Sequence, residues 1–293
     1  MSIKRITIIG LGLIGGSLGL ALKKARGAQI EVTGCARRDE VAEKAIEHGA
    51  VDRTESRPGK AVAEAELVIV ATPVMAIKDA FEQISAHLSP GAIVSDVGST
   101  KAQIMKWAQE SLPQTINFIG GHPMTGKETA GIDEAEAGLF EGCIYCLTPS
   151  RHASPQALKS MEEMIGWIGA RPLLIEAEPH DELVAGISHL PLVLSSTLVA
   201  TLAENNQWPD MSKLAASGYG DTTRLASGDP ELYCGICLTN RQAIVEWVDR
   251  YIQRLKECRQ LITENEEGLK EFFQQARESR ENWLKNEGSQ FKK

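Results

Sequence analysis

The sequence of 293 residues has no extended block of basic residues, and its formal net charge is −8. Proteins that bind nucleic acid or anionic membrane surfaces through charge need clustered lysine and arginine, so neither is an expected partner. The sequence also shows no internal repeat and no low-complexity segment. Its 43% hydrophobic and 24% charged residues are typical of a globular protein with a large core, which favours a small-molecule ligand.

Two hydrophobic stretches lack the features of membrane targeting. The stretch 6–22 follows Lys4 and Arg5, but it contains five glycines and has no small-residue cleavage site of the kind that signal peptides carry. The stretch 183–203 is uncharged over 21 residues, but His189, Pro191 and several hydroxyl side chains interrupt it. This composition favours buried helices over a lipid span, so we expect a cytoplasmic protein.

The six cysteines include two CxxC pairs, a spacing that often indicates zinc. Cys143 and Cys146 lie in a strand-like segment, where residues three apart point to opposite faces. Cys234 and Cys237 lie in a helix-like segment without the turn of a zinc knuckle. We therefore predict no metal site, and we interpret the cysteines as buried thiols in a reducing compartment.

A glycine-rich turn follows the first predicted strand, 3–9, and precedes a predicted helix that ends near Arg26. In a GxGxxG turn between strand and helix, Gly10 permits the tight turn, Gly12 lets the backbone approach a pyrophosphate, and Gly15 lets the helix contact the strand. The alternative is a glycine-rich turn that binds nothing. Five residues of this turn are predicted to bind a dinucleotide: Gly10, Gly12, Leu13, Ile14 and Gly15.

The second predicted strand, 30–35, is not followed by the acidic residue that accepts the ribose hydroxyls of NAD. Arg37 and Arg38 stand there instead, and two guanidinium groups fit a 2′-phosphate. The sequence therefore favours NADP, with NAD possible. The alternative is that both arginines are solvated and the site accepts either cofactor.

Strand and helix patterns then alternate, which predicts a Rossmann-like, doubly wound parallel sheet in an α/β fold. Ligands bind beyond the carboxyl ends of the strands in such sheets. Thr72, Pro73, Ser99 and His122 all follow predicted strands, and Ser99 with Thr100 is expected to cap the next helix. The further predicted strands are 66–71, 92–96, 115–119, 145–147 and 172–175, with helices at 75–87 and 101–111.

His122 lies in a predicted flexible loop over residues 119–131 that also contains Glu128. Because the pKa of histidine lies near neutrality, a histidine beside a dinucleotide site can act as general base for an alcohol that is being oxidised. The alternative is a loop histidine without a chemical role. The remainder of the chain has to distinguish between them.

From residue 180 onward the pattern is helical almost throughout, so we predict a dinucleotide-binding domain at 1–177 and a helical substrate and dimerisation domain at 178–293. The expected helices are 182–203 and 230–286, with a short segment at 212–217. The uncharged helix 183–203 favours a homodimer. Arg224, in a polar loop at 217–230, either binds a substrate carboxylate or pairs with Asp221 or Asp229.

Five segments together resemble the prephenate and arogenate dehydrogenases of tyrosine biosynthesis. The resemblance implies NAD(P)-dependent oxidative decarboxylation of a cyclohexadienyl acid by an N-terminal nucleotide-binding domain followed by a helical dimerisation domain. Prephenate would give 4-hydroxyphenylpyruvate. The segments that carry the resemblance are Gly10–Ser17, Asp96–Lys101, Gly120–Gly126, Ile187–Pro191 and Asp221–Pro230.

The resemblance also implies roles for single residues. His122 matches the catalytic base, Ser99 a serine that hydrogen-bonds the histidine or the substrate hydroxyl, and Arg224 an arginine that binds a substrate carboxylate. Leu192 and Gly220 stand where many relatives have a second histidine and a cationic residue. Fewer cations, together with Glu128 near His122, would suit arogenate, which carries an ammonium group.

Two other classes stay open on the sequence. A β-hydroxyacid dehydrogenase or imine reductase would share the glycine turn and the helical half, but it would place a lysine where this chain has Ser188 and His189. A non-enzymatic nucleotide-sensing protein would need no His122 and would turn over no cyclohexadienyl acid.

Overall fold

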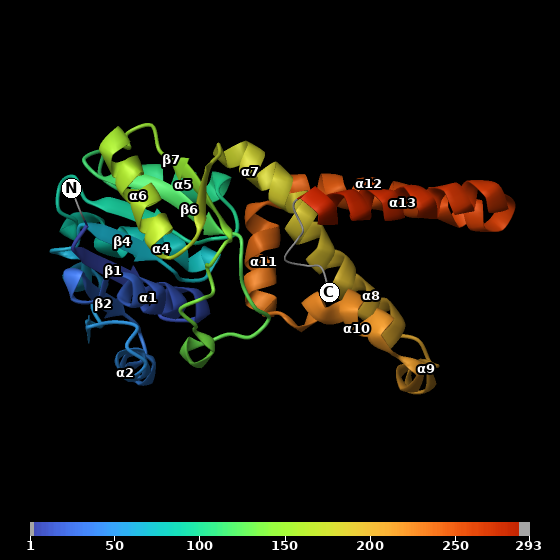
Figure 1. Cartoon of the computed structure of the whole chain (residues 1–293), viewed down its shortest axis with the longest axis horizontal. Helices are drawn as coiled ribbons and strands as arrows, with labels where there is room; N and C mark the ends of the chain where they lie inside the picture. Colours follow the sequence, from blue (N-terminus) through green and yellow to red (C-terminus); the bar gives the residue numbers. More distant parts are fainter. Residues whose placement is uncertain (1–2, 287–293) are drawn as a thin grey trace. The chain divides into compact units, whose positions relative to one another are not determined.

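The computed structural model describes residues 3–286, and contacts divide the chain into two compact units, residues 1–244 and 245–293. The first unit contains an eight-stranded sheet of order β3-β2-β1-β4-β5-β6-β7-β8 (Figure 1). Its strands are β1 (Arg5–Ile9), β2 (Glu31–Cys35), β3 (Arg53–Thr54), β4 (Leu67–Val70), β5 (Ile93–Asp96), β6 (Asn117–Pro123), β7 (Ile144–Pro149) and β8 (Arg171–Leu174).

The first six strands are parallel, but β7 runs antiparallel to β6 and β8 runs parallel to β7. The prediction of a doubly wound parallel sheet in an α/β fold is thus confirmed for β1 to β6, while the last two strands, β7 and β8, reverse direction. A parallel connection needs a crossover, usually a helix. Only a short 3₁₀ turn, Ile132–Glu134, lies between β6 and β7, whereas helix α6 (Pro155–Trp167) connects β7 to β8.

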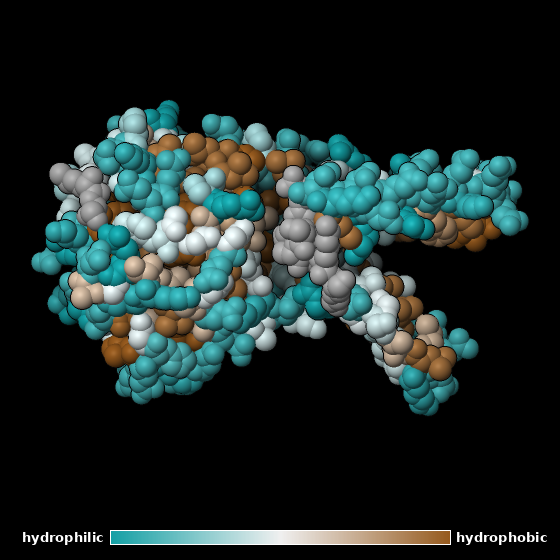
Figure 2. All heavy atoms as spheres, viewed as in Figure 1, coloured by the Kyte–Doolittle hydropathy of each residue, from teal (hydrophilic) through white to brown (hydrophobic). Residues whose placement is uncertain are grey.

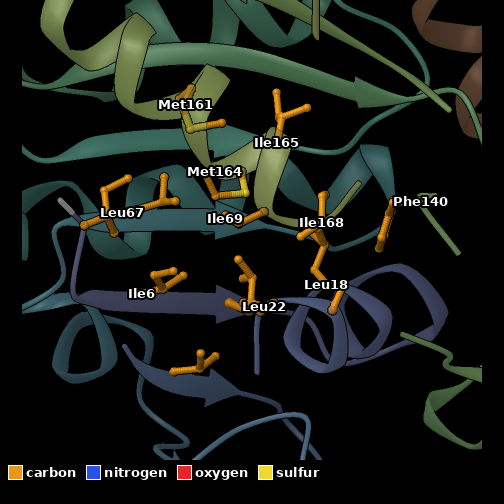
Figure 3. Close-up of a cluster of buried hydrophobic side chains, with 14 of the residues drawn as sticks. Ile6, Leu18, Leu22, Leu67, Ile69, Phe140, Met161, Met164, Ile165 and Ile168 are labelled. Carbon is orange, nitrogen blue, oxygen red and sulfur yellow. The ribbon is translucent and has the colours of Figure 1, made fainter. Parts of the chain in front are cut away.

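Alternating side chains of the central strands form two cores, one on each face of the sheet. Ile6 and Ile8 of β1 and Leu67 and Ile69 of β4 pack with α1 and α6, as Figure 3 shows for several of them. The intervening side chains, such as Val68, pack with helices on the opposite face. The covering helices are α1 (Leu13–Arg26), α2 (Asp39–Glu47) and α6 on the first face, with α3 (Pro58–Val62), α4 (Ile77–Ile84) and α5 (Ala102–Ser111) on the second.

The helices after β8 begin with a continuous stretch in which a π-helical segment, Ala185–His189, separates α7 (Ala177–Val184) from α8 (Leu190–Ala203). The elements that follow are α9 (Trp208–Leu214), α10 (Ser217–Thr223), a 3₁₀ turn (Arg224–Ser227) and α11 (Pro230–Thr239). The predicted loop at 217–230 is therefore mostly helical. Threonine hydroxyls bond carbonyls one turn back within α10, and Asp229 caps α11.

The predicted helical stretch 230–286 is broken twice. The first break, at Asn240, separates α11 from α12 (Arg241–Glu264), and the second separates α12 from α13 (Glu266–Asn286). The break before α13 occurs at Asn265, whose side-chain oxygen accepts a hydrogen bond from the Gly268 N–H at 3.0 Å. Contacts place the boundary between the two compact units after Ile244, inside α12. The predicted domain boundary near residue 177 lies within the first unit and stays a prediction.

The stretch Ala177–Ala203 is long and apolar enough to cross a membrane by length and composition, and 33% of its most apolar window is buried. Figure 2 shows hydrophobic residues at the surface along α8 and α9. Leu183 and Ile187 are 60% and 72% exposed, and Leu214 is also exposed. These exposed apolar residues form a group and are not scattered singly over the surface. Such a group is typical of an interaction surface.

Candidate active site

The glycine turn after β1 has the geometry of a dinucleotide site. Gly10 adopts φ +94°, which favours glycine, and its N–H donates to the Cys35 carbonyl at 2.9 Å. A Cβ on Gly15 would lie 1.9 Å from the Gly10 carbonyl oxygen, so helix α1 can approach the strand only at a glycine. Nothing lies within 4 Å of a Cβ on Gly12, so the space above this backbone is open to a ligand.

The N-terminus of α1, where Leu13 and Ile14 begin the helix, fits an anionic group. It has no side-chain cap and no acidic residue in its first turn, so its N–H groups are available to a pyrophosphate. Thr72 and Pro73 follow shortly after β4, and the Thr72 hydroxyl is buried without a hydrogen-bond partner among residues 3–286. A buried hydroxyl without a partner beside the glycine turn supports a bound ligand here.

The end of β2 carries no carboxylate. The pKa of the Cys35 thiol is raised to about 11 by its burial and by nearby Glu55, so the thiol is neutral. Arg37 and Arg38 are exposed just beyond it. A cavity of about 270 Å³ at this point is lined by Ala36, Asp39, Ala42, Thr54, Glu55 and Ser56. The site thus offers two cations just beyond the strand end and two carboxylates, Asp39 at the start of α2 and Glu55 after β3.

His122 lies in strand β6, paired opposite Cys146 of β7, and not in a loop as predicted. The apolar pattern of 115–119 ends before the strand does, because Gly120 and Gly121 continue the ladder without apolar side chains. A Cβ on Gly121 would lie 2.5 Å from the Asp96 carbonyl oxygen, so β5 and β6 meet at a glycine here. His122 therefore stands on a rigid element at the carboxyl edge of the parallel strands.

The His122 side chain is only 8% exposed, and its pKa is lowered well below the usual value. Burial is the main cause, and positive charge on Lys101, His180 or His189 acts in the same direction. His122 is thus neutral at physiological pH, which is the form in which an imidazole can accept a proton.

Two residues of α7 that we did not single out from the sequence contact His122. His122 Nδ1 lies 2.9 Å from His180 Nε2, and His180 Nδ1 lies 2.8 Å from Asp181 Oδ1. All three side chains are buried. The only local signal is the adjacent His180-Asp181 pair at the start of the helical half, and its partner is 58 residues away in the chain.

The Asp181 carboxylate also caps helix α5. Its Oδ1 accepts from the Lys101 N–H at 2.7 Å and its Oδ2 from the Ala102 N–H at 2.9 Å. The prediction that Ser99 and Thr100 cap this helix is wrong, because no side chain of the preceding segment does so. Thr100 instead shares a hydrogen bond of 2.9 Å with the Thr239 hydroxyl.

Lys101 forms a buried ion pair with Asp96, and both side chains are fully inaccessible. The Lys101 ammonium also donates to the Gly121 carbonyl at 2.7 Å. Asp96 accepts from the N–H groups of Gly98 at 2.7 Å and Gly121 at 3.1 Å. Burial lowers the pKa of Lys101, and Asp96 opposes this shift. The pair fixes the end of β5 against the residue that precedes His122.

Ser99 is half-buried in the loop after β5, and among residues 3–286 its hydroxyl makes no hydrogen bond to His122. His189 is fully buried nearby, and Asn240 connects it to α7. The Asn240 amide nitrogen lies 3.2 Å from His189 Nδ1 and donates to the Asp181 carbonyl at 2.7 Å. Burial lowers the pKa of His189 to about 4, while its Nε2 has no hydrogen-bond partner within the described part of the chain.

Arg224 forms an ion pair with Glu128, and not with Asp221 or Asp229 as one alternative predicted. Glu128 lies in the segment after β6, and the Arg224 side chain is 61% exposed. The structure therefore brings together two predicted substrate-binding residues that are 96 positions apart. In the described residues no hydrogen bond links this pair to His122.

The described residues contain no group of three or more potential metal ligands, and all six cysteines are free thiols. Cys143 immediately precedes β7 and Cys146 lies within it, whereas Cys234 and Cys237 lie in α11.

Comparisons with known proteins give family matches over both halves of the chain. The family profile described as prephenate dehydrogenase, nucleotide-binding domain, matches residues 18–174, and the profile described as prephenate dehydrogenase, dimerization domain, matches residues 176–275. The prephenate dehydrogenase of Bacillus subtilis (strain 168) is 33% identical over 279 residues, which are 94% of this chain and 75% of that protein.

Two crystal structures resemble the fold over nearly its whole length. Synechocystis arogenate dehydrogenase is 33% identical with a TM-score of 0.81, and the match covers 95% of this chain and 99% of that chain. The prephenate dehydrogenase from A. aeolicus in complex with hydroxyphenyl propionate and NAD+ is 27% identical, with a TM-score of 0.89 and coverage of 96% and 99%.

Proposed function

This chain belongs to the prephenate dehydrogenase family of NAD(P)-dependent dehydrogenases, and from this premise we propose that it oxidises and decarboxylates prephenate to 4-hydroxyphenylpyruvate in tyrosine biosynthesis. The observation that carries the proposal is a buried, neutral His122 on the edge of the sheet where the glycine turn also lies. A neutral imidazole at this edge can take a proton from a ring hydroxyl.

A nicotinamide cofactor bound at the glycine turn would supply the hydride acceptor. His122 Nε2 removes the proton of the ring hydroxyl while the hydrogen on the same ring carbon leaves as hydride, which forms a carbonyl. The bond to the ring carboxylate then breaks, carbon dioxide leaves, and the bonding electrons complete the aromatic ring. The carbonyl oxygen becomes a phenolate, which takes the proton back from His122. Because aromatisation drives this loss, the protein mainly has to orient the substrate and accept one proton.

Arg224 is proposed to bind a substrate carboxylate with its planar guanidinium group. Its ion pair with Glu128 supports this role, because that carboxylate stands where a substrate carboxylate would bind, and the substrate would have to displace it. Ser99 is proposed to hydrogen-bond the substrate hydroxyl. Its half-buried position on the loop after β5 supports this, since that loop ends at the same edge of the sheet as His122.

Arogenate is the second candidate substrate. Leu192 is buried and Gly220 lies in α10 with nothing within 4 Å of a Cβ, so neither position supplies a cation. An acidic side chain, Glu128, lies next to Arg224 instead. Arogenate carries an ammonium group where prephenate carries a keto group. A site with fewer cations repels this ammonium group less, so the charge balance suits arogenate.

NADP is the proposed preferred cofactor, with NAD as the alternative. Arg37 and Arg38 are exposed beyond β2 and can contact a 2′-phosphate, and the neutral Cys35 does not repel it. Glu55 is the residue that can accept ribose hydroxyls if NAD is used. The five turn residues Gly10, Gly12, Leu13, Ile14 and Gly15 would hold the pyrophosphate with either cofactor.

The assembly is proposed to be a cytoplasmic homodimer. The match of residues 176–275 to a dimerization-domain profile and the exposed apolar side chains of the stretch Ala177–Ala203 support a second copy as the partner of this surface. The polar contacts of His180, Asp181 and His189 within the same stretch argue against a lipid span. Sedimentation equilibrium of the purified protein would measure the mass of the assembly.

Initial rates of nicotinamide reduction with prephenate and with arogenate, each with NAD and with NADP, test the proposal. The fastest pair identifies substrate and cofactor. His122→Asn is expected to reduce kcat by about 10²- to 10⁴-fold, the usual contribution of a general base. His152→Asn, a change at an exposed histidine, is the matched control and should leave the rates unchanged. The proposal fails if the wild-type protein turns over none of the four pairs.

A further inference from the structure

The hydrogen bonds of His122 and His180 determine which ring nitrogen of each histidine carries a proton. Asp181 Oδ1 can only accept in its ionised form, so His180 must present a proton on Nδ1 across the 2.8 Å contact. The Nε2 of a neutral His180 is then unprotonated and acts as acceptor. His122 must therefore donate from Nδ1 across the 2.9 Å contact, which leaves its own Nε2 unprotonated.

The two imidazoles differ in their charged surroundings. On one side, Lys101 donates to the carbonyl of Gly121, next to His122, and a positive charge on Lys101 disfavours a second charge on His122. On the other side, Asp181 contacts His180 directly. The Asp181 carboxylate would therefore stabilise a positive charge that arrives on His180.

We propose that His180 is a positioning residue and proton acceptor for His122, so that the two histidines and Asp181 form a relay. This inference rests on the proposed function of His122 as base. When His122 Nε2 takes the hydroxyl proton, the proton on His122 Nδ1 moves to His180 Nε2, and His180 becomes an imidazolium beside the Asp181 carboxylate. One proton enters the pair, one N–H bond forms on each ring, and one breaks on His122. After the reaction the proton on His180 Nε2 returns to His122 Nδ1, and the proton taken from the hydroxyl leaves from His122 Nε2.

The groups that surround the relay come from several elements. His122 comes from β6 and is followed by Pro123, which has no charge. Asp181 comes from α7, His189 from the π-helical segment, and Lys101 immediately precedes α5, where its ammonium pairs with Asp96 at the end of β5. Asn240, after α11, contributes a neutral amide to Asp181 and His189. Asp181 is thus the anion that contacts the pair directly, while the positive charge of Lys101 lies on the side of His122.

The test compares the wild-type protein with His180→Gln. Glutamine has a carbonyl oxygen that can still accept from His122 Nδ1, but it cannot take the proton. We expect kcat/KM to fall by about 100-fold, toward the lower end of the contribution of a general base. The low-pH limb of its pH profile should move to lower pH by about one unit, because protonated His122 loses its stabilisation by the relay. The matched control, His152→Gln, changes an exposed histidine and should move neither quantity.

A purely structural role predicts a different result. If His180 only supports the fold, His180→Gln would lower the plateau of the profile and leave the limb in place, and this result would overturn the relay. Cofactor affinity, measured by quenching of protein fluorescence, should stay within about twofold, since in the described part of the chain His180 makes no hydrogen bond to the glycine turn.

A second measurement does not depend on turnover. Nitrogen NMR of ¹⁵N-histidine-labelled wild-type protein should show both His122 and His180 protonated on Nδ1 at neutral pH, with assignment from single histidine substitutions. A proton on His180 Nε2 would reverse the direction of the hydrogen bond and overturn the proposal. If the tautomers are as expected and no cyclohexadienyl acid is turned over, the proposed function fails while the hydrogen-bond arrangement stands.

Discussion

The strand edge and the helical segment α7–α11 contribute to the same site in different ways. On the sheet, Gly10, Thr72, Ser99 and His122 occupy the ends of parallel strands, so their proximity follows from the order of the elements. On the helices, His180 contacts His122, Asp181 contacts the start of α5, and Asn240 contacts Asp181, each across more than 50 positions. Local pattern locates the first group, whereas only the packed structure locates the second.

The largest expected effect comes from the sheet side, at the buried ion pair of Asp96 with Lys101. Asp96→Asn leaves a buried ammonium without a counter-charge, which destabilises a protein by about 3–5 kcal/mol. Chemical denaturation measures this loss. Asp210→Asn, which removes the exposed pair with Lys213, is the control and should change stability by less than about 1 kcal/mol. Equal effects of the two substitutions would show that burial of the first pair is energetically unimportant.

The next effect comes from the helical side, where His189 is buried with its pKa lowered to about 4. A histidine whose folded-state pKa lies below its unfolded value of about 6.5 favours folding fully above pH 6.5. That contribution is lost as the pH falls from 6.5 toward 4, by on the order of 3 kcal/mol. Denaturation at pH 7.5 and at pH 4.5 should therefore show a larger loss for the wild-type protein than for His189→Gln. A loss of equal size in both proteins would contradict the burial of a neutral His189.

The third prediction concerns Arg224, a residue of the helical segment that is expected to affect substrate binding but not the stability of the fold. Arg224→Gln removes the charge that is proposed to bind a substrate carboxylate, so KM should rise about 10- to 100-fold, equivalent to about 1.4–2.7 kcal/mol. Stability should change little, because the ion pair with Glu128 is largely exposed. Glu128→Gln is the matched control, since it breaks the same pair and leaves Arg224 free. An equal rise in KM for both variants would show that the ion pair itself is what matters.

The smallest effect on stability is expected at Gly12. A Cβ there meets nothing within 4 Å, so Gly12→Ala should change the free energy of unfolding by less than about 1 kcal/mol, while it weakens cofactor binding at the open backbone. Gly15→Ala is the contrasting variant, because its Cβ would meet the Gly10 carbonyl oxygen. Titration with NADP and thermal unfolding of both variants separate the two roles. A stability loss at Gly12 as large as that at Gly15 would contradict the open site.

The sequence predicted most of the sheet because buried parallel strands such as 67–70 are short apolar runs between turn residues. It did not predict the reversal at β7, since the strand pattern of 144–149 does not depend on direction. It placed His122 at the correct edge but in a loop, because Gly120 and Gly121 resemble a turn. It could not predict that Asp181 caps α5, since a cap supplied from 79 positions away leaves no pattern at the helix it caps.

The one π-helical segment among residues 3–286, Ala185–His189, determines more than its own conformation. In an uninterrupted α-helix each residue turns by about 100°, so His180 and His189, nine positions apart, would point in opposite directions. A wider turn of i→i+5 bonding changes this phase, and Asn240 can then contact both Asp181 and His189. The same change of phase applies to every residue of α8 that follows. The segment that changes the helical phase between His180 and His189 therefore also sets which side of α8 presents its apolar residues to a neighbouring molecule.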